Sequence, residues 1–102
     1  MKALPVNVVS YKRTPEFTNS SVPSGLLHAH RTKATVWGEI VILAGTLTYR
    51  ILEPAEEEVS LTPENFGVIE PTVKHEVVPQ SGVRFHVQFY REAMPDIPTA
   101  RK

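Results

Sequence analysis

The chain has 102 residues, 11 Lys plus Arg against 11 Asp plus Glu, and no cysteine. The formal net charge of zero argues against a nucleic-acid-binding surface, and the lack of cysteine excludes disulfides, thiolate catalysis and Cys-ligated metal sites. This length predicts one domain over residues 1–102, with its core at about 6–92 and a proline-containing tail at 93–102. The chain shows no signal peptide and no membrane-spanning run, so we expect a cytoplasmic protein without membrane or nucleic-acid partners.

Short apolar runs separated by proline and glycine predict a succession of strands. Residues 13–23 are expected to form a loop, and the acidic stretch 54–58 a solvated turn. The two most regular runs, 36–43 and 46–52, are expected to pair as a hairpin through Gly45. About eight strands in all predict an all-β, antiparallel sandwich or barrel. These strands are expected at residues 6–12, 26–31, 36–43, 46–52, 59–61, 66–70, 71–78 and 83–91.

The four histidines are the strongest candidates for a functional site in this sequence. His28 and His30 are two apart in a predicted strand, so their side chains share one face. His75 lies at the start of another strand, and His86 is on the polar face of the last one. Burying an imidazole without a polar partner costs free energy. Histidines that face into a small barrel therefore need a partner, and a shared metal ion would be one. The alternative is that some of them face solvent and bind no metal.

Histidine ligands without thiolates suit one divalent metal ion, Zn²⁺ first, with Fe²⁺, Ni²⁺, Cu²⁺ and Mn²⁺ as alternatives. Arg84, Gln88 and Tyr90 share the alternating face of His86, which makes them candidates for a pocket that holds a small, anionic ligand. The chain has no Gly-x-Ser-x-Gly elbow and no glycine-rich phosphate loop, so nucleophilic catalysis and nucleotide binding are not indicated.

Several motifs taken together resemble the small cupin family related to the N-terminal domain of tellurite-resistance protein B. The likeness rests on stretches from about Val8 to Arg91, namely Gly25–Lys33, Val36–Ile40, Leu43–Tyr49, Pro71–His75 and Val83–Arg91. It implies a cupin-like β-barrel (a double-stranded β-helix, or jelly roll) that binds one metal through His28, His30, His75 and His86. It also implies a link to tellurite or toxic-anion response, and a homodimer by analogy.

The chain departs from the generic cupin pattern at one ligand position. Gly38 stands where metal cupins carry a glutamate, and Glu39 is one residue off, which leaves His86 or Gln88 for that corner of the metal. The full tellurite-resistance protein continues into a methyltransferase domain that this chain does not resemble, so no methyl transfer is expected.

The sequence therefore predicts a metal-binding domain that binds or senses a small anion. The alternatives are a small metal-dependent enzyme, such as an oxygenase or isomerase, and a plain structural barrel. An enzyme would need an acid or base near the metal, for which the sequence offers Tyr90, Glu39 or Glu76. For the core, or for a subunit interface, we expect Trp37 or Ile40, Ile42, Leu47 and Phe89.

Overall fold

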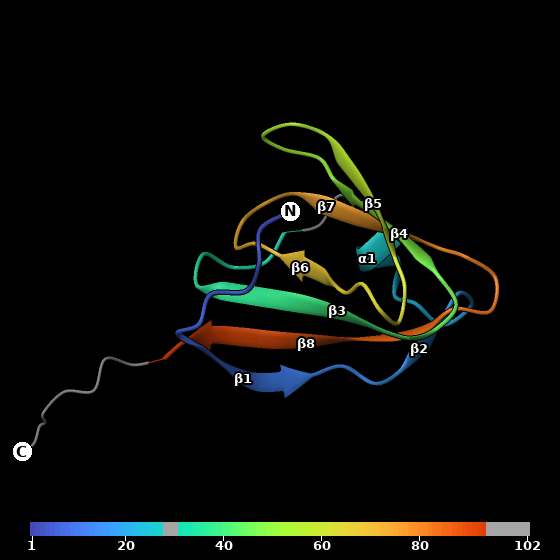
Figure 1. The fold of residues 1–102 in the computed structure, drawn as a ribbon, viewed down its shortest axis with the longest axis horizontal. Coiled ribbons are helices and arrows are strands. Elements are labelled where there is room, and N and C mark those ends of the chain that lie inside the picture. The colour runs from blue at the N-terminus through green and yellow to red at the C-terminus, as the bar shows by residue number, and fades with distance from the viewer. Residues whose placement is uncertain (28–30, 94–102) are drawn as a thin grey trace, which may run out of the picture.

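The computed structural model describes residues 1–27 and 31–93, and within them the chain forms eight strands and one short helix (Figure 1). In chain order these are β1 Val8–Arg13, β2 Phe17–Thr18, α1 Ser24–Leu27, β3 Val36–Ala44, β4 Leu47–Ile51, β5 Glu57–Leu61, β6 Gly67–Ile69, β7 His75–Pro79 and β8 Arg84–Glu92. The predicted all-β class is thus confirmed. No helix of the described residues has the length and apolar character that crossing a bilayer requires.

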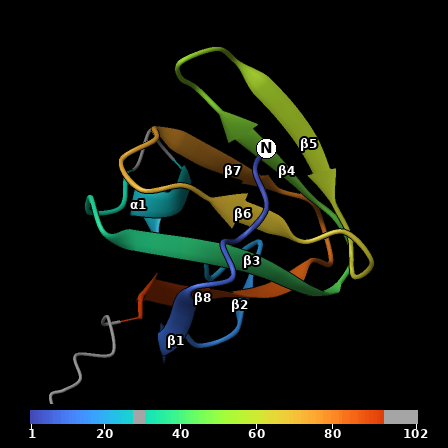
Figure 2. The same cartoon turned by 60° about the vertical axis from the view of Figure 1, so that its left-hand side comes forward.

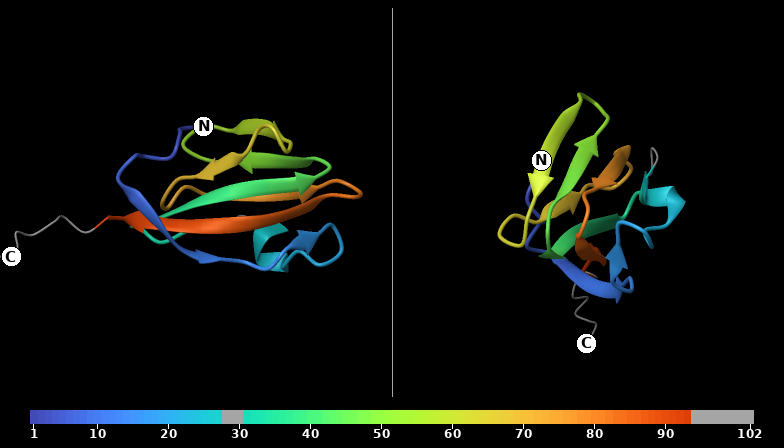
Figure 3. Two further views of the ribbon diagram at one scale, coloured as in Figure 1. Left: turned by 60° about the horizontal axis from the view of Figure 1, so that its bottom comes forward. Right: turned by 90° about the vertical axis from the view of Figure 1, so that its right-hand side faces the viewer.

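The strands form two antiparallel sheets that pack on each other (Figure 2, Figure 3). The larger sheet has the order β1-β8-β3-β6, with β2 also paired to β8, and the smaller has the order β5-β4-β7. The two packed sheets match the expected sandwich, but the expected barrel is not closed within the described residues, because no strand ladder joins the sheets. The cupin jelly roll therefore stays a prediction.

The core lies between the inner faces of the two sheets. In β4, Leu47, Tyr49 and Ile51 are buried and alternate with half-buried Thr48 and Arg50, as the sequence pattern predicts. The Tyr49 hydroxyl donates a hydrogen bond of 3.0 Å to the Val68 carbonyl on β6, so it links the sheets. Of the expected core residues, Ile40, Ile42 and Leu47 are buried and Phe89 packs against the cluster, whereas Trp37 is half-buried.

The predicted hairpin of residues 36–43 and 46–52 is wrong. β3 pairs with β6 and β8, whereas β4 pairs with β5 and β7 in the other sheet. The chain changes sheet at Gly45, whose φ is +76°, and a Cβ there would lie 2.9 Å from the Val83 Cα. The glycine that was expected to close a hairpin instead fits a crossing where the backbone runs close to another segment.

Three boundaries also differ from the expected ones. Leu26 and Leu27 belong to α1 and not to a strand, and the expected loop 13–23 contains β2. The acidic stretch reaches into β5, where Glu58 lies opposite Arg50. Arg50 contacts Glu58 at 2.9 Å and Glu76 at 2.7 Å, so a line of charges crosses the outer side of the smaller sheet.

Candidate functional site

His75 is a fully buried imidazole between the two sheets. It begins β7 opposite Ile51 of β4, with 0% of its surface exposed. Its Nδ1 lies 3.1 Å from the Val73 carbonyl, and its ring meets the edge of Tyr49 with centroids 5.9 Å apart. A carbonyl can only accept, so Nδ1 carries the proton and Nε2 carries the lone pair. That is the tautomer in which a histidine binds a metal through Nε2.

His86 lies on the opposite side of the larger sheet. On β8, Phe85 and Val87 are buried in the core, so His86 between them points to the outer face, beside Val41 of β3. There it lines a cavity of about 260 Å³ with Arg13, Thr14, Pro15, Glu16 and Leu43. Burial lowers the pKa of His86 below its usual value, and the nearby charge of Arg13 lowers it further. His75 and His86 therefore do not share a face.

The three residues expected to form the ligand pocket also lie away from His75. Gln88 and Tyr90 share the outer face with His86: Gln88 donates to the Ser10 hydroxyl, and Tyr90 donates to Glu39 at 3.0 Å. Arg84 is exposed and forms a 2.5 Å contact with Glu16, which holds the pKa of that carboxyl below its usual value. The predicted alternation of β8 is confirmed, but its polar side faces out of the sandwich.

His28 and His30 lie outside the described residues, and the chain on both sides of them meets the region around His75. Before them, α1 packs against β7. After them, Arg31 donates to the Thr72 carbonyl at 3.0 Å, and the Thr72 amide donates to the Thr32 carbonyl at 3.2 Å. Within residues 1–27 and 31–93, no three metal-ligating side chains gather at one point.

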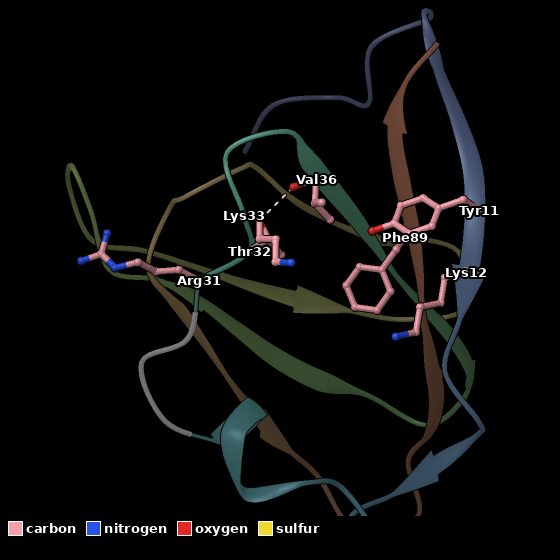
Figure 4. A pocket seen from close by; sticks show the side chains of 7 residues that line it. All are labelled: Tyr11, Lys12, Arg31, Thr32, Lys33, Val36 and Phe89. Carbon is pink, nitrogen blue, oxygen red and sulfur yellow. Dashed lines mark hydrogen bonds between the residues drawn. The ribbon is translucent and has the colours of Figure 1, made fainter. Parts of the chain in front are cut away.

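A cavity that sequence reasoning missed lies on the inner side of the larger sheet. It measures about 260 Å³ and is bounded by β1, β8 and the loop before β3 (Figure 4). Phe89 points to this side because it shares the face of Phe85 and Val87. The lining residues are Tyr11, Lys12, Arg31, Thr32, Lys33, Val36 and Phe89. The signal that could have revealed it is the basic run that directly follows the His-x-His pair, Arg31 to Lys33.

The loop side of this cavity is held by hydrogen bonds. The Thr32 hydroxyl donates to the Val36 carbonyl at 2.9 Å and approaches the Glu70 carbonyl at 3.4 Å. Arg31 is 2.5 Å from Glu53, so its charge is balanced. The same short loop therefore lines the cavity at one end and contacts residues 70–72, just before β7, at the other.

Comparison with known proteins identifies a matching family and similar solved structures. The sequence pattern of the TehB-like domain family matches residues 12–87. The crystal structure of TehB from Haemophilus influenzae has a TM-score of 0.79 and 27% identity, over 85% of this chain but only 32% of that one. A protein from Escherichia coli strain K12 has a TM-score of 0.80 and 20% identity, over 92% of this chain and 100% of its own.

No curated protein sequence matches the chain. It spans about a third of the length of the Haemophilus TehB chain, and the Escherichia coli protein, at 20% identity, is evidence for the fold alone. The family pattern runs from the end of β1 into the first half of β8 and covers about three-quarters of the sequence. The chain therefore belongs to the TehB-like domain family.

Proposed function

We propose that this TehB-like domain binds a small anion beside a divalent metal ion held by His28, His30 and His75. In this proposal it is a binding or sensing module of a response to tellurite or other toxic anions, and its two-sheet fold is a variant of the cupin jelly roll. Zn²⁺ is the first candidate metal, with Fe²⁺, Ni²⁺, Cu²⁺ and Mn²⁺ as alternatives.

The observation that carries the proposal is the buried state of His75. His75 has no exposed surface, and its Nδ1 lies 3.1 Å from the Val73 carbonyl. This contact supports a role for its Nε2 as a metal ligand. The contacts of α1 with β7 and of Arg31 with Thr72 bring the described residues on both sides of the His-x-His pair close to β7, which supports the choice of ligands. These ligands fit a borderline metal that prefers nitrogen donors.

His86 is left out of the proposed ligand set because it projects from the other face of β8. A three-histidine site leaves a coordination position for an anion oxygen, which the metal would attract and polarise when bound. The protein's own part is to hold each imidazole in the tautomer and orientation that the metal needs. His75 does this through its bond to the Val73 carbonyl.

A binding role is favoured over an enzymatic one by the placement of the candidate acid and base groups. Tyr90 and Glu39 contact each other on the outer face of the larger sheet. Glu76 follows His75 on β7 and pairs with Arg50 on the outer side of the smaller sheet. None of the three shares the inner side with His75, so none is placed to move a proton at a metal there.

The test is the metal content of the protein purified without a polyhistidine tag. We expect about one metal ion per chain in the wild type, and a large loss of metal in His28→Gln, His30→Gln and His75→Gln. His86→Gln is the matched control and should keep its metal. Affinity should fall steeply below about pH 6.5, because each ligand must be neutral to bind.

A melting temperature that rises with added Zn²⁺ at neutral pH, and not in acid, would support the same site. The proposal is wrong if the wild type contains no metal and none of the five candidate metals changes its melting temperature. Equal metal loss in His86→Gln and His75→Gln would restore His86 to the ligand set.

A further inference from the structure

The cavity bounded by β1, β8 and the loop before β3 carries positive charge that no described carboxylate balances. Of its basic side chains, Arg31 is paired with Glu53 and extends away from the others in Figure 4. Lys12 and Lys33 form no ion pair within the described part of the chain, and no acidic residue lines the cavity. Two ammonium groups beside one hollow repel each other, and an anion between them would replace repulsion with attraction.

Apolar and aromatic side chains form another part of the cavity wall. The half-buried ring of Phe89 lies between Lys12 on β1 and Lys33 on the loop, and Val36 lines the same cavity (Figure 4). Tyr11 adds a second ring whose hydroxyl can donate a hydrogen bond. The Arg91 guanidinium lies 5.3 Å from the centre of the Tyr11 ring, so it adds positive charge next to that ring.

We infer that this cavity binds a small organic anion, a carboxylate attached to a planar or apolar body. Lys12 and Lys33 contact the carboxylate, and Phe89 and Val36 cover the body. An inorganic oxyanion would satisfy the lysines but leave the ring and Val36 in water, and a neutral aromatic compound would leave the two charges unbalanced. The inference goes beyond the proposed function, because it concerns this cavity alone and is independent of the metal.

The volume restricts the ligand to a small one. At about 260 Å³ the cavity is just below the range of about 300–1,000 Å³ that is usual for pockets of drug-sized ligands. A single ring with one carboxylate is therefore a suitable probe, and benzoate has this form. Because both lysines are exposed, binding should weaken as the salt concentration rises.

The experiment titrates the full chain, treated with EDTA, with benzoate, benzamide and inorganic phosphate. Binding is followed by calorimetry and by the chemical shifts of backbone amides around residues 11–12, 31–36 and 89. Benzoate should bind, and benzamide and phosphate should each bind at least about tenfold more weakly. Benzamide lacks the negative charge, and phosphate lacks the apolar ring. Phosphate binding as tightly as benzoate would overturn the organic-anion assignment.

Variants that remove one positive charge test whether benzoate binds in this cavity. Lys12→Gln and Lys33→Gln should each lower benzoate affinity by about three- to fivefold, and the double variant by more than either. Lys2→Gln is the control, since it removes an exposed ammonium that lies 3.8 Å from Glu70 and does not line this cavity. Melting temperatures should be unchanged in all of them. A double variant that binds benzoate like the wild type would overturn the inference.

Two outcomes distinguish the proposed metal site from the proposed anion cavity. Benzoate binding by EDTA-treated protein whose metal uptake fails would support the cavity and contradict the metal centre. A protein that takes up one metal per chain and binds no benzoate, with metal or without, would do the reverse.

Discussion

The two histidines that the structure describes occupy contrasting surroundings. His75 has no exposed surface, touches Tyr49 and is anchored to the Val73 carbonyl. His86 is half-buried on the outer face of the larger sheet, where Arg13 and Glu16 lie close to it. Both histidines lie in strands, so the difference comes from whether the side chain is on the face of the strand that packs on the core. The interior is sensitive to shape and hydrogen bonding, whereas the outer face responds mainly to charge.

Truncation of each histidine should show the largest contrast. His75→Ala leaves a cavity in the core, and we expect it to lower the free energy of unfolding by about 2–4 kcal/mol. His86→Ala should cost about 0.5–1 kcal/mol, because its surroundings can take up water. Urea unfolding in the presence of EDTA measures both without any contribution from a metal. Equal losses would mean that the two sites are not interior and surface as described.

A matched pair of tyrosines tests the same contrast through one atom. Tyr49→Phe removes a buried hydroxyl and leaves the Val68 carbonyl without that bond, at an expected cost of about 1–3 kcal/mol. Tyr90→Phe removes a hydroxyl that donates to half-buried Glu39, and should cost at most about 1 kcal/mol. The difference between the two midpoints of urea unfolding, at equal m-values, is the quantity to compare. A larger loss for Tyr90→Phe would contradict the packing of the sheets around Tyr49.

The smallest expected effect is the pH dependence that His86 contributes. Its pKa is lowered by burial and by Arg13, while Glu16 and Glu39 act in the opposite direction. The folded state then binds this proton more weakly than the unfolded state, so stability should rise with pH just below the ordinary pKa of 6.5 and level off above it. NMR titration of metal-free protein should give a midpoint below 6.5. His86→Gln should flatten this part of the stability profile, and an unchanged profile would assign it to another group.

Local alternation carried the correct part of the sequence-based prediction. The pattern of Leu47, Tyr49 and Ile51 repeats every second residue and marks a half-buried strand on its own. The same pattern in β8 separated Phe85 and Val87 from His86. What it did not specify was that the polar side of β8 faces outward, because that depends on which sheet packs against it.

Long-range pairing was the part that the sequence alone did not supply. Gly45 is equally compatible with a hairpin turn and with a change of sheet, and only the close approach of Val83 distinguishes the two. The cavity lined by Lys12, Lys33 and Phe89 was missed for the same reason. Its walls come from three stretches far apart in the sequence, and no single stretch shows a binding motif.

The central position of β8 has a consequence for how the chain folds. This last strand pairs with β1, β2 and β3, and its register joins Val8 to Glu92 across almost the whole described chain. Such non-local pairing predicts slow folding, in milliseconds to seconds, for a domain of this size. During synthesis on the ribosome, the pairing of β1, β2 and β3 with β8 cannot form until β8 has been synthesised. Until then β1, β2 and one edge of β3 lack partners, and exposed strand edges of this kind favour pairing with other chains.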